Sequence, residues 1–324
     1  MPLNKLDRAR GCLAGLAIGD ALGRPVEGMS SSEIRTKFGD VQSFLSQTPG
    51  GSDDTEYAIL TAHALLKYGR SVTSQQIAQL WIEKVCQQTE TFLGAGFSEM
   101  AAIANLKSGL LPPQSGKHFH AWSDGLAMRV APIGIVGDGD LALTKRLTIA
   151  DGEVSHSGEG IESGIAISTA ISAAMVGADA RECVTVAKNS IKEDSWSHRA
   201  IVAAEKIVAD GSRLDIHSLT DEIVDRVATH DYVYADLAPE AVSLALAAVL
   251  FGDGDFVKTL LFAVNMGRDA DTIAAMAGAI TGAMVGFESI PEHWRNTMQE
   301  VQGSCLAYTR GINPVDLAEE LVAL

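Results

Sequence analysis

Residues 11–23 read Gly-Cys-Leu-Ala-Gly-Leu-Ala-Ile-Gly-Asp-Ala-Leu-Gly, with a glycine at every fourth position. A second stretch near the other end of the chain repeats this spacing at positions 278, 282 and 286. In an α-helix, a spacing of four places the glycines on one face. Each glycine costs a helix about 1 kcal/mol relative to alanine, so two such faces indicate that another backbone must approach closely. We predict that these two helices lie in the core and pack against each other, bringing opposite ends of the chain together.

The rest of the chain also has the apolar spacing of helices. Apolar residues recur three or four positions apart, turn sequences separate these segments, and no stretch shows the sustained alternation that strands require. We therefore predict an all-α fold, a compact single-domain helical bundle over residues 1–324. The expected helices are 6–22, 57–68, 75–86, 161–175, 180–191, 200–208, 216–227, 241–250 and 273–285, and the expected turns are 112–113, 137–139, 151–152, 210–211 and 252–254.

The composition excludes two classes of protein. The 324 residues include 25 Lys and Arg against 41 Asp and Glu, a formal net charge of −16. Such a chain lacks the basic surface that nucleic-acid binding needs. Its hydrophobic content of 47% is too high for a disordered chain.

Three features bear on the compartment. The longest nearly uncharged apolar stretch, residues 272–287, is shorter than the ~20 residues of a membrane helix. The first twenty residues lack the layout of a signal peptide. The four cysteines, at positions 12, 86, 183 and 305, have no metal-binding spacing and are expected to be buried thiols. We therefore expect a cytoplasmic protein that binds neither membrane nor nucleic acid.

Two acidic clusters each stand on a glycine-containing loop directly before an expected helix. They are Gly50-Gly51-Ser52-Asp53-Asp54-Thr55 and Gly267-Arg268-Asp269-Ala270-Asp271-Thr272. Helix capping accounts for one acidic residue in each, because a carboxylate accepts hydrogen bonds from free backbone amides. It does not account for two carboxylates so close together, which repel unless a cation or other donors offset them. Because hard divalent cations prefer all-oxygen ligands, the clusters together predict one two-metal site closed by long-range packing.

Other motifs are weaker evidence for a functional site. The sequences Asp138-Gly139-Asp140 and Asp253-Gly254-Asp255 resemble the start of a calcium loop, but the fifth position is Ala142 or Val257, which offers no side-chain ligand. We interpret both as turns. The aromatic neighbourhood at residues 119–122 fits a wall on which a base stacks, and equally a surface loop clamped onto the core.

Five ordered motifs, spread over nearly the whole chain, resemble the ADP-ribosylglycohydrolase family, which includes the dinitrogenase-reductase-activating glycohydrolases. They are residues 11–27, Ser52-Asp53-Asp54-Thr55, residues 124–132, Ser155-His156, and residues 267–274. The resemblance implies an all-α fold of the ADP-ribosylglycohydrolase type. It also implies an enzyme that uses two divalent cations, Mg²⁺ or Mn²⁺.

The resemblance further implies roles for particular residues. The metal ligands would be Ser52, Asp53, Asp54, Asp269, Asp271 and Thr272. Glu27 matches a family glutamate near the site with gating or catalytic roles. The segments that contact the ADP-ribose moiety match Trp122, Ser123, Asp124, Gly125 and His156.

The chemistry of such an enzyme suits these residues. Hydrolysis at an anomeric carbon passes through an oxocarbenium-like state, and two cations can hold the ribose diol and lower the pKa of a bound water. A carboxylate then accepts the proton, and Glu27, Asp54 and Asp271 are all candidates for this catalytic role. An anionic diphosphate would need local compensation, which the cations, helix N-termini and Arg129 or Arg268 would provide.

Two residues depart from the pattern common among relatives. Asp124 stands where many have Asn, and Arg268 stands where many have Gly. We expect an anionic group to hold the Arg268 guanidinium, and the two candidates are Asp124 and a substrate phosphate. Either one would make Arg268 a residue that selects the substrate.

Three hypotheses for function follow. The first is a hydrolase that removes ADP-ribose from a protein, with an arginine side chain as the acceptor. The second is a glycosidase that acts on a smaller ribosyl compound such as a nucleoside. The third is a non-enzymatic relative that binds a ligand or serves a structural role, which the intact metal residues disfavour.

Overall fold

The computed structural model describes residues 3–211, 214–232, 234–297 and 300–324, and over these ranges the chain is helical with no β-sheet. Two isolated antiparallel bridges join Ser30 to Gly267 and Ser123 to Leu237. The predicted all-α fold is confirmed. The α-helices are α1 (Lys5–Gly23), α2 (Ser31–Phe38), α3 (Asp53–Tyr68), α4 (Ser74–Lys84), α5 (Phe97–Lys107), α6 (Ala131–Gly137), α7 (Leu141–Ser155), α8 (Glu159–Met175), α9 (Ala180–Ser190), α10 (Trp196–Asp210), α11 (Ile216–Val227), α12 (Ala238–Gly252), α13 (Phe256–Asn265), α14 (Ala270–Val285), α15 (Glu292–Arg295) and α16 (Ala318–Val322). Short 3₁₀-helices are η1 (Arg24–Val26), η2 (Gly69–Ser71), η3 (Asp124–Arg129), η5 (Phe287–Ser289), η6 (Ala307–Thr309) and η7 (Pro314–Leu317).

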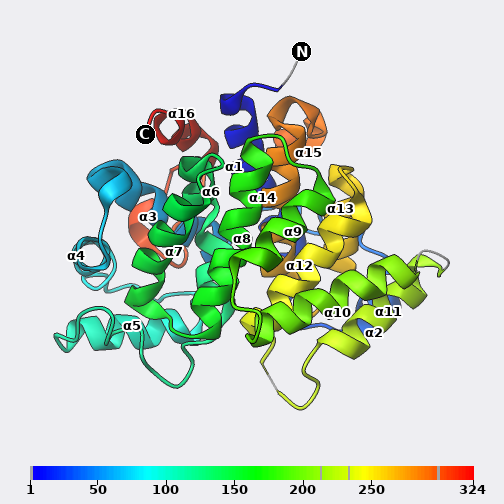
Figure 1. Ribbon diagram of the computed structural model, residues 1–324, viewed down its shortest axis with the longest axis horizontal. Helices are drawn as coiled ribbons and strands as arrows, with labels where there is room; N and C mark the ends of the chain where they lie inside the picture. Colours follow the sequence, from blue (N-terminus) through cyan, green and yellow to red (C-terminus); the bar gives the residue numbers. More distant parts are fainter. Residues whose placement is uncertain (1–2, 212–213, 233, 298–299) are drawn as a thin grey trace.

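Helices α1 and α14 form an antiparallel pair near the middle of the molecule (Figure 1). A Cβ atom added to any of three α1 glycines would overlap a backbone carbonyl oxygen of α14; the pairs are Gly11 with Gly282, Gly15 with Gly278, and Gly19 with Ala274. The two backbones are therefore in direct contact, as the glycine spacing predicted. This contact sets the start of α14 beside the C-terminal half of α1.

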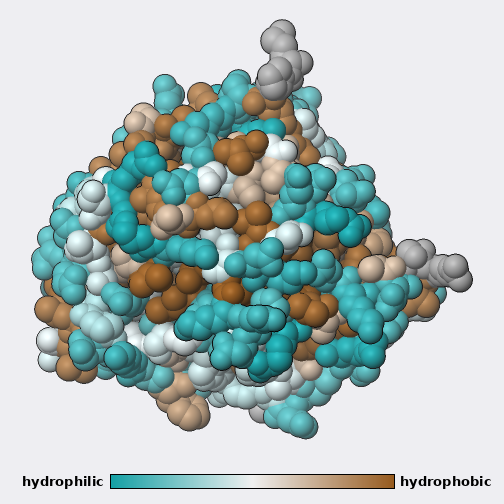
Figure 2. Space-filling model, viewed as in Figure 1, coloured by the Kyte–Doolittle hydropathy of each residue, from teal (hydrophilic) through white to brown (hydrophobic). Residues whose placement is uncertain are grey.

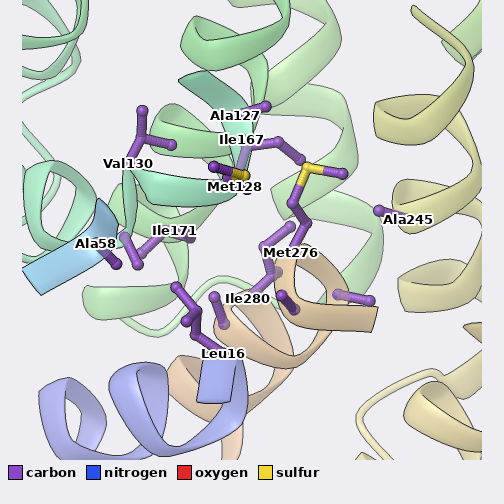
Figure 3. Close-up of a cluster of buried hydrophobic side chains, with 14 of the residues drawn as sticks. Leu16, Ala58, Ala127, Met128, Val130, Ile167, Ile171, Ala245, Met276 and Ile280 are labelled. Carbon is purple, nitrogen blue, oxygen red and sulfur yellow. The ribbon is translucent and has the colours of Figure 1, made fainter. Parts of the chain in front are cut away.

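The apolar core surrounds this pair. Figure 3 shows side chains from α1, α3, α8, α12, α14 and the region of η3 converging on one buried cluster. Small and aliphatic side chains fill it, which permits close packing of helix on helix. The residues labelled there, each at most 4% exposed, are Leu16, Ala58, Ala127, Met128, Val130, Ile167, Ile171, Ala245, Met276 and Ile280.

One predicted turn is wrong. Asp151-Gly152 lies inside α7, where the Asp151 carboxylate is buried and accepts hydrogen bonds from Arg129. Gly152 serves packing, because a Cβ there would lie 2.7 Å from a methyl of Leu126. Sequence periodicity also missed α2, α5, α6, α7, α13, α15 and α16. Helix α6 shows the cause, since its seven residues are all buried and leave no polar face to mark a period.

Polar and apolar residues are mixed on the face of the molecule seen in Figure 2. Over the described ranges, no helix has both the length and the apolar character needed to cross a membrane. The four cysteines are buried and form no disulfide, as expected.

Candidate active site

A cavity of about 470 Å³ lies where the starts of α3, α14 and η3 meet. Five of the six residues predicted as metal ligands line it, and so does Glu27. The sixth, Ser52, begins α3 directly beside it and is buried. The two acidic clusters, far apart in the sequence, thus meet at one cavity. The metal-ligand candidates on its wall are Asp53, Asp54, Asp269, Asp271 and Thr272.

Helix α3 is held at its start by a carboxylate from α1. Asp20, fully buried, accepts hydrogen bonds from the backbone N–H of Ser52 (2.7 Å) and from the N–H and hydroxyl of Thr55. The N-cap of α3 is the hydroxyl of Ser52, which accepts from the N–H of Asp54 (3.4 Å). Since Ser52 performs the capping, the carboxylates of Asp53 and Asp54 remain available for another purpose.

Helix α14 leaves Asp269 similarly uncommitted, whereas Asp271 Oδ1 accepts one hydrogen bond, from the backbone N–H of Thr272 (3.1 Å). Asp269 occupies the N-cap position, but its side chain caps no backbone amide. The hydroxyl of Thr272 donates to Asp54 Oδ1 across the cavity wall (3.1 Å). The other oxygen, Asp54 Oδ2, is buried without a hydrogen-bond partner. Helix capping therefore does not explain the acidic clusters.

The carboxylates form two overlapping groups. In one, oxygens of Asp20, Asp54 and Asp271 all lie within 4.8 Å of one another, and in the other the same is true of Glu27, Asp269 and Asp271. Asp271 belongs to both groups. Among the described residues, no Lys or Arg forms an ion pair with any of these five.

This concentration of charge disfavours ionisation. Burial, and then the neighbouring Asp20, raise the pKa of Asp54 well above its ordinary value. Burial, and then Asp269, raise the pKa of Asp271 in the same way and that of Glu27 to a lesser degree. Ionised carboxylates packed this closely require a cation among them.

The Glu27 segment is joined to the second acidic cluster by backbone hydrogen bonds. The N–H of Gly28 donates to the carbonyl of Arg268, and the N–H of Arg268 donates to the carbonyl of Met29, both at 2.8 Å. A Cβ at Gly267 would overlap the Met29 carbonyl. Glu27 is therefore placed at the cavity by the same loop that carries Asp269.

The partner of Arg268 is neither of the two that we expected. Its guanidinium pairs with Glu240, from Nε to Oε1 at 2.5 Å and from Nη2 to Oε2 at 3.3 Å. Glu240 is 1% exposed and lies at the start of α12, and it also accepts from the backbone N–H of Thr229. Arg268 adopts a positive φ of 62°, which is unusual for a residue with a side chain. The pair thus ties the Asp269 loop to α12.

Arg129 is also unavailable to a substrate phosphate. Its side chain is fully buried and donates to Glu99 Oε1 (3.0 Å) and, from two nitrogens, to Asp151 Oδ1 (2.9 and 2.6 Å). It also donates to the Gly125 carbonyl and the Ser155 hydroxyl. Of the two arginines proposed to compensate a diphosphate, Arg129 is buried behind these contacts, and Arg268 lines the cavity but already pairs with Glu240.

The residues predicted to contact substrate divide into two sets. Ser123, Asp124 and Gly125 line the cavity, as does Arg268, but Trp122 and His156 are not among its lining residues. His156 is buried, and its Nε2 lies 3.2 Å from the Ser123 hydroxyl. Trp122 packs edge-on against Tyr232, with ring centroids 5.2 Å apart. His156 therefore lies behind Ser123, and Trp122 lies outside the cavity lining.

Comparisons with known proteins agree with this geometry. The family model described as ADP-ribosylglycohydrolase matches residues 1–324. This chain belongs to the ADP-ribosylglycohydrolase family. It is 32% identical over 309 residues to an uncharacterized protein of Archaeoglobus fulgidus (91% of this chain, 92% of that one). It is 25% identical to human ADP-ribosylhydrolase ARH3 (91% and 90%) and to ADP-ribosylarginine hydrolase Tri1 of Pseudomonas putida (90% and 74%).

A solved structure described as an ADP-ribosylglycohydrolase-related protein complex has the same fold. The TM-score is 0.66 at 22% identity, covering 98% of each chain. As a member of the ADP-ribosylglycohydrolase family, this chain is an enzyme that hydrolyses glycosidic bonds.

Sequence analysis of this ADP-ribosylglycohydrolase missed three residues at or beside the site. Asp20 had a detectable signal, because a lone acid within an apolar, glycine-striped helix must be buried against a partner. Glu99 and Glu240 had no such signal in the sequence. Their partners, Arg129 and Arg268, lie 30 and 28 positions away and are reached only through the tertiary fold.

Proposed function

We propose that this protein cleaves the glycosidic bond between ADP-ribose and an acceptor, that the acceptor is a protein arginine side chain, and that the reaction requires two divalent cations, Mg²⁺ or Mn²⁺. The supporting observation is the convergence of Asp54, Asp271 and Glu27 on one cavity without a basic partner. The arginine acceptor is supported by the likeness to Tri1, which is named for ADP-ribosylarginine.

The donors in the cavity fit two hard cations. They are all oxygen atoms, and one of them, Asp54 Oδ2, is buried with no partner. We assign Ser52, Asp53, Asp54, Asp269, Asp271 and Thr272 as the residues that hold the cations. Asp20 belongs to one acidic group, but Ser52 and Thr55 already donate to its oxygens, so we assign it to holding α3 in place.

We assign the general base to Glu27. Bound cations supply Lewis acidity and lower the pKa of a water molecule. Asp54 and Asp271 are buried and committed to holding cations, whereas Glu27 is exposed at the cavity. Its raised pKa makes its carboxylate a better acceptor for the proton of the attacking water.

One observation favours a second candidate function, a glycosidase for a smaller ribosyl compound such as a nucleoside. Arg268 is the one basic residue among the described residues that line the cavity, and Glu240 already holds it. A substrate without phosphates would not need a free cationic side chain.

A substrate panel tests both candidates. ADP-ribosyl-arginine, ADP-ribosyl-serine and inosine are each incubated with Mg²⁺, with Mn²⁺ and with EDTA, using Asp54→Asn as the inactive control. We expect metal-dependent release of ADP-ribose from the arginine conjugate. Cleavage of inosine alone would select the smaller substrate, and release that persists in EDTA would refute the metal-dependent reaction.

A further inference from the structure

One carboxylate on the cavity wall belongs to neither acidic group. Glu99 lies in the first turn of α5 and lines the cavity, but the two sets of clustered carboxylates found among the described residues do not include it. Its side chain is fully buried. One oxygen, Oε1, accepts from Arg129 Nη1 at 3.0 Å, whereas Oε2 has no hydrogen-bond partner among the described residues. A buried carboxylate oxygen is costly unless a donor reaches it.

The polar groups around Glu99 are already engaged with other partners. The Nε and Nη2 atoms of Arg129 donate to Asp151, and Nη2 also donates to the hydroxyl of Ser155. His156 Nε2 lies 3.8 Å from Glu99 Oε1, beyond hydrogen-bond distance, and 3.2 Å from the hydroxyl of Ser123. The donor for Oε2 must therefore come from a molecule that enters the cavity.

Glycines of the cavity lining leave the space that this carboxylate occupies. A Cβ atom on Gly125 would lie 2.7 Å from Glu99 Oε2, and one on Gly96 would lie 3.0 Å from it. A Cβ atom on Gly94 would lie 2.7 Å from Oδ1 of Asp53, one of the proposed metal ligands. The segment from residue 94 to residue 99 therefore borders the proposed cation site at one end and Gly125 at the other.

A hydroxyl group is the donor that fits this oxygen best. An ionised carboxylate only accepts hydrogen bonds, so a phosphate, which carries the same charge, is unsuitable. Because Arg129 already holds Oε1, the carboxylate needs a single further donor. A ribose hydroxyl can donate its proton even when its oxygen binds a cation, and an O–H donor forms a short, strong hydrogen bond with a carboxylate.

We propose that Glu99 binds a hydroxyl of the ribose whose glycosidic bond is cleaved, which makes it a substrate-binding residue in addition to the metal ligands. This inference rests on the proposed function, and it holds for ADP-ribose and for a smaller ribosyl compound, since both carry this ribose. Hydrogen bonds to the hydroxyl beside the anomeric carbon strengthen in the transition state of glycoside hydrolysis. The contact would therefore favour ribosyl over deoxyribosyl substrates.

The test compares the binding of ADP-ribose with that of ADP, which lacks only the terminal ribose. Both are titrated by calorimetry into the Mg²⁺-loaded protein and into Glu99→Gln. In the variant, Arg129 retains the amide oxygen, and the NH₂ group, a donor, faces the cavity. We expect Glu99→Gln to weaken ADP-ribose by about tenfold to a hundredfold and ADP by less than about twofold. Equal weakening of both ligands, or of neither, would overturn the proposal.

Asp151→Asn is the matched control. Asp151 shares Arg129 with Glu99 and is equally buried, but it does not line the cavity. We expect this change to lower Tm and to preserve the ratio of the two affinities. A shift in the ratio as large as that of Glu99→Gln would show that the effect passes through Arg129, which would make the role of Glu99 structural. Loss of a bound metal ion from Glu99→Gln would also overturn the proposal.

The unaltered protein provides a measurement that does not depend on the folding of a variant. It should bind ADP-ribose more tightly than ADP, and equal affinities would overturn the ribose contact. Because binding needs no turnover, the test is separate from the reaction itself. A protein that cleaves no ADP-ribosyl-arginine, but whose affinity for ADP-ribose alone falls in Glu99→Gln, would sustain the contact and refute the proposed reaction.

Discussion

Two buried acidic clusters in this protein are neutralised in different ways. Glu99 and Asp151 share the guanidinium of Arg129, and all three are at most 1% exposed. Asp54 and Asp271 are nearly as buried but have no Lys or Arg partner among the described residues. The first cluster has its counter-charge within the chain, although Glu99 also lines the cavity and its Oε2 has no hydrogen-bond partner. The second is complete only with a ligand, so a missing counter-charge marks the binding site better than burial does.

The largest expected effect falls on the neutralised cluster. Arg129→Met leaves Glu99 and Asp151 buried without a cation, and we expect a loss of ~3–5 kcal/mol in the free energy of unfolding. Urea denaturation measures it. Arg181→Met, at an exposed arginine, is the control and should change stability by less than about 0.5 kcal/mol. Equal effects of the two substitutions would show that the buried arginine contributes no more than a surface one.

The second prediction concerns the cluster without a counter-charge. Asp271→Asn removes the carboxylate that belongs to both groups of clustered carboxylates, Asp20–Asp54–Asp271 and Glu27–Asp269–Asp271. We expect kcat/KM to fall about a thousandfold, equivalent to ~4 kcal/mol of transition-state stabilisation. The same change removes repulsion, so the metal-free protein should be no less stable than the parent in EDTA. A large loss of stability in EDTA would place Asp271 with the structural cluster.

The third prediction concerns pH and metal removal. Burial, followed by neighbouring carboxylates, raises the pKa of Asp54, Asp271 and Asp53 in the folded protein, and burial raises that of Asp236 to about 6. The folded state then binds more protons than the unfolded chain, so the stability of the metal-free protein falls as pH rises through these values. Divalent cations relieve the repulsion, and their stabilising effect should increase with pH.

Thermal unfolding checks this at pH 5.5 and pH 8 in Mg²⁺ and in EDTA. At a cation concentration one hundred times Kd, we expect Mg²⁺ to stabilise the fold by about 2.7 kcal/mol. The rise in Tm on adding Mg²⁺ should be larger at pH 8, and comparing this rise at the two pH values cancels titrations elsewhere in the protein. An equal rise at both would contradict the prediction.

The smallest expected effect concerns the ion pair between Arg268 and Glu240, which ties the Asp269 loop of the second cluster to α12. Arg268→Gly relieves a positive φ but leaves Glu240 buried without its cation. We expect a double-mutant cycle with Glu240→Gln to give a coupling energy of about 1 kcal/mol, because the double variant recovers part of the loss. Additive effects would show that the pair does not stabilise the loop.

The difference between the two clusters also explains which parts of the site the sequence predicted. The metal-site carboxylates were predicted because adjacent acids such as Asp53 and Asp54 repel each other, and this repulsion is evident within a few residues of sequence. The glycine spacing likewise predicted the central helix pair. Glu99 and Glu240 were missed, and the partner of Arg268 was wrong, because each of these carboxylates is ordinary in its own segment. Tertiary packing alone brings Glu99 to Arg129 and Glu240 to Arg268, over separations of 30 and 28 residues.

The contact between the α1 and α14 glycines has a consequence for biosynthesis. Asp20 and Asp271 stand on helices separated by some 250 residues of chain, so the acidic site cannot form until α14 has left the ribosome. Until then, the glycine face of α1 lacks the α14 backbone against which it packs. A slip of one helical turn, ~5.4 Å, in this contact would move the two carboxylates out of each other's reach. Helix α1 can therefore contribute to the active site only after residues in the last third of the chain have been synthesised.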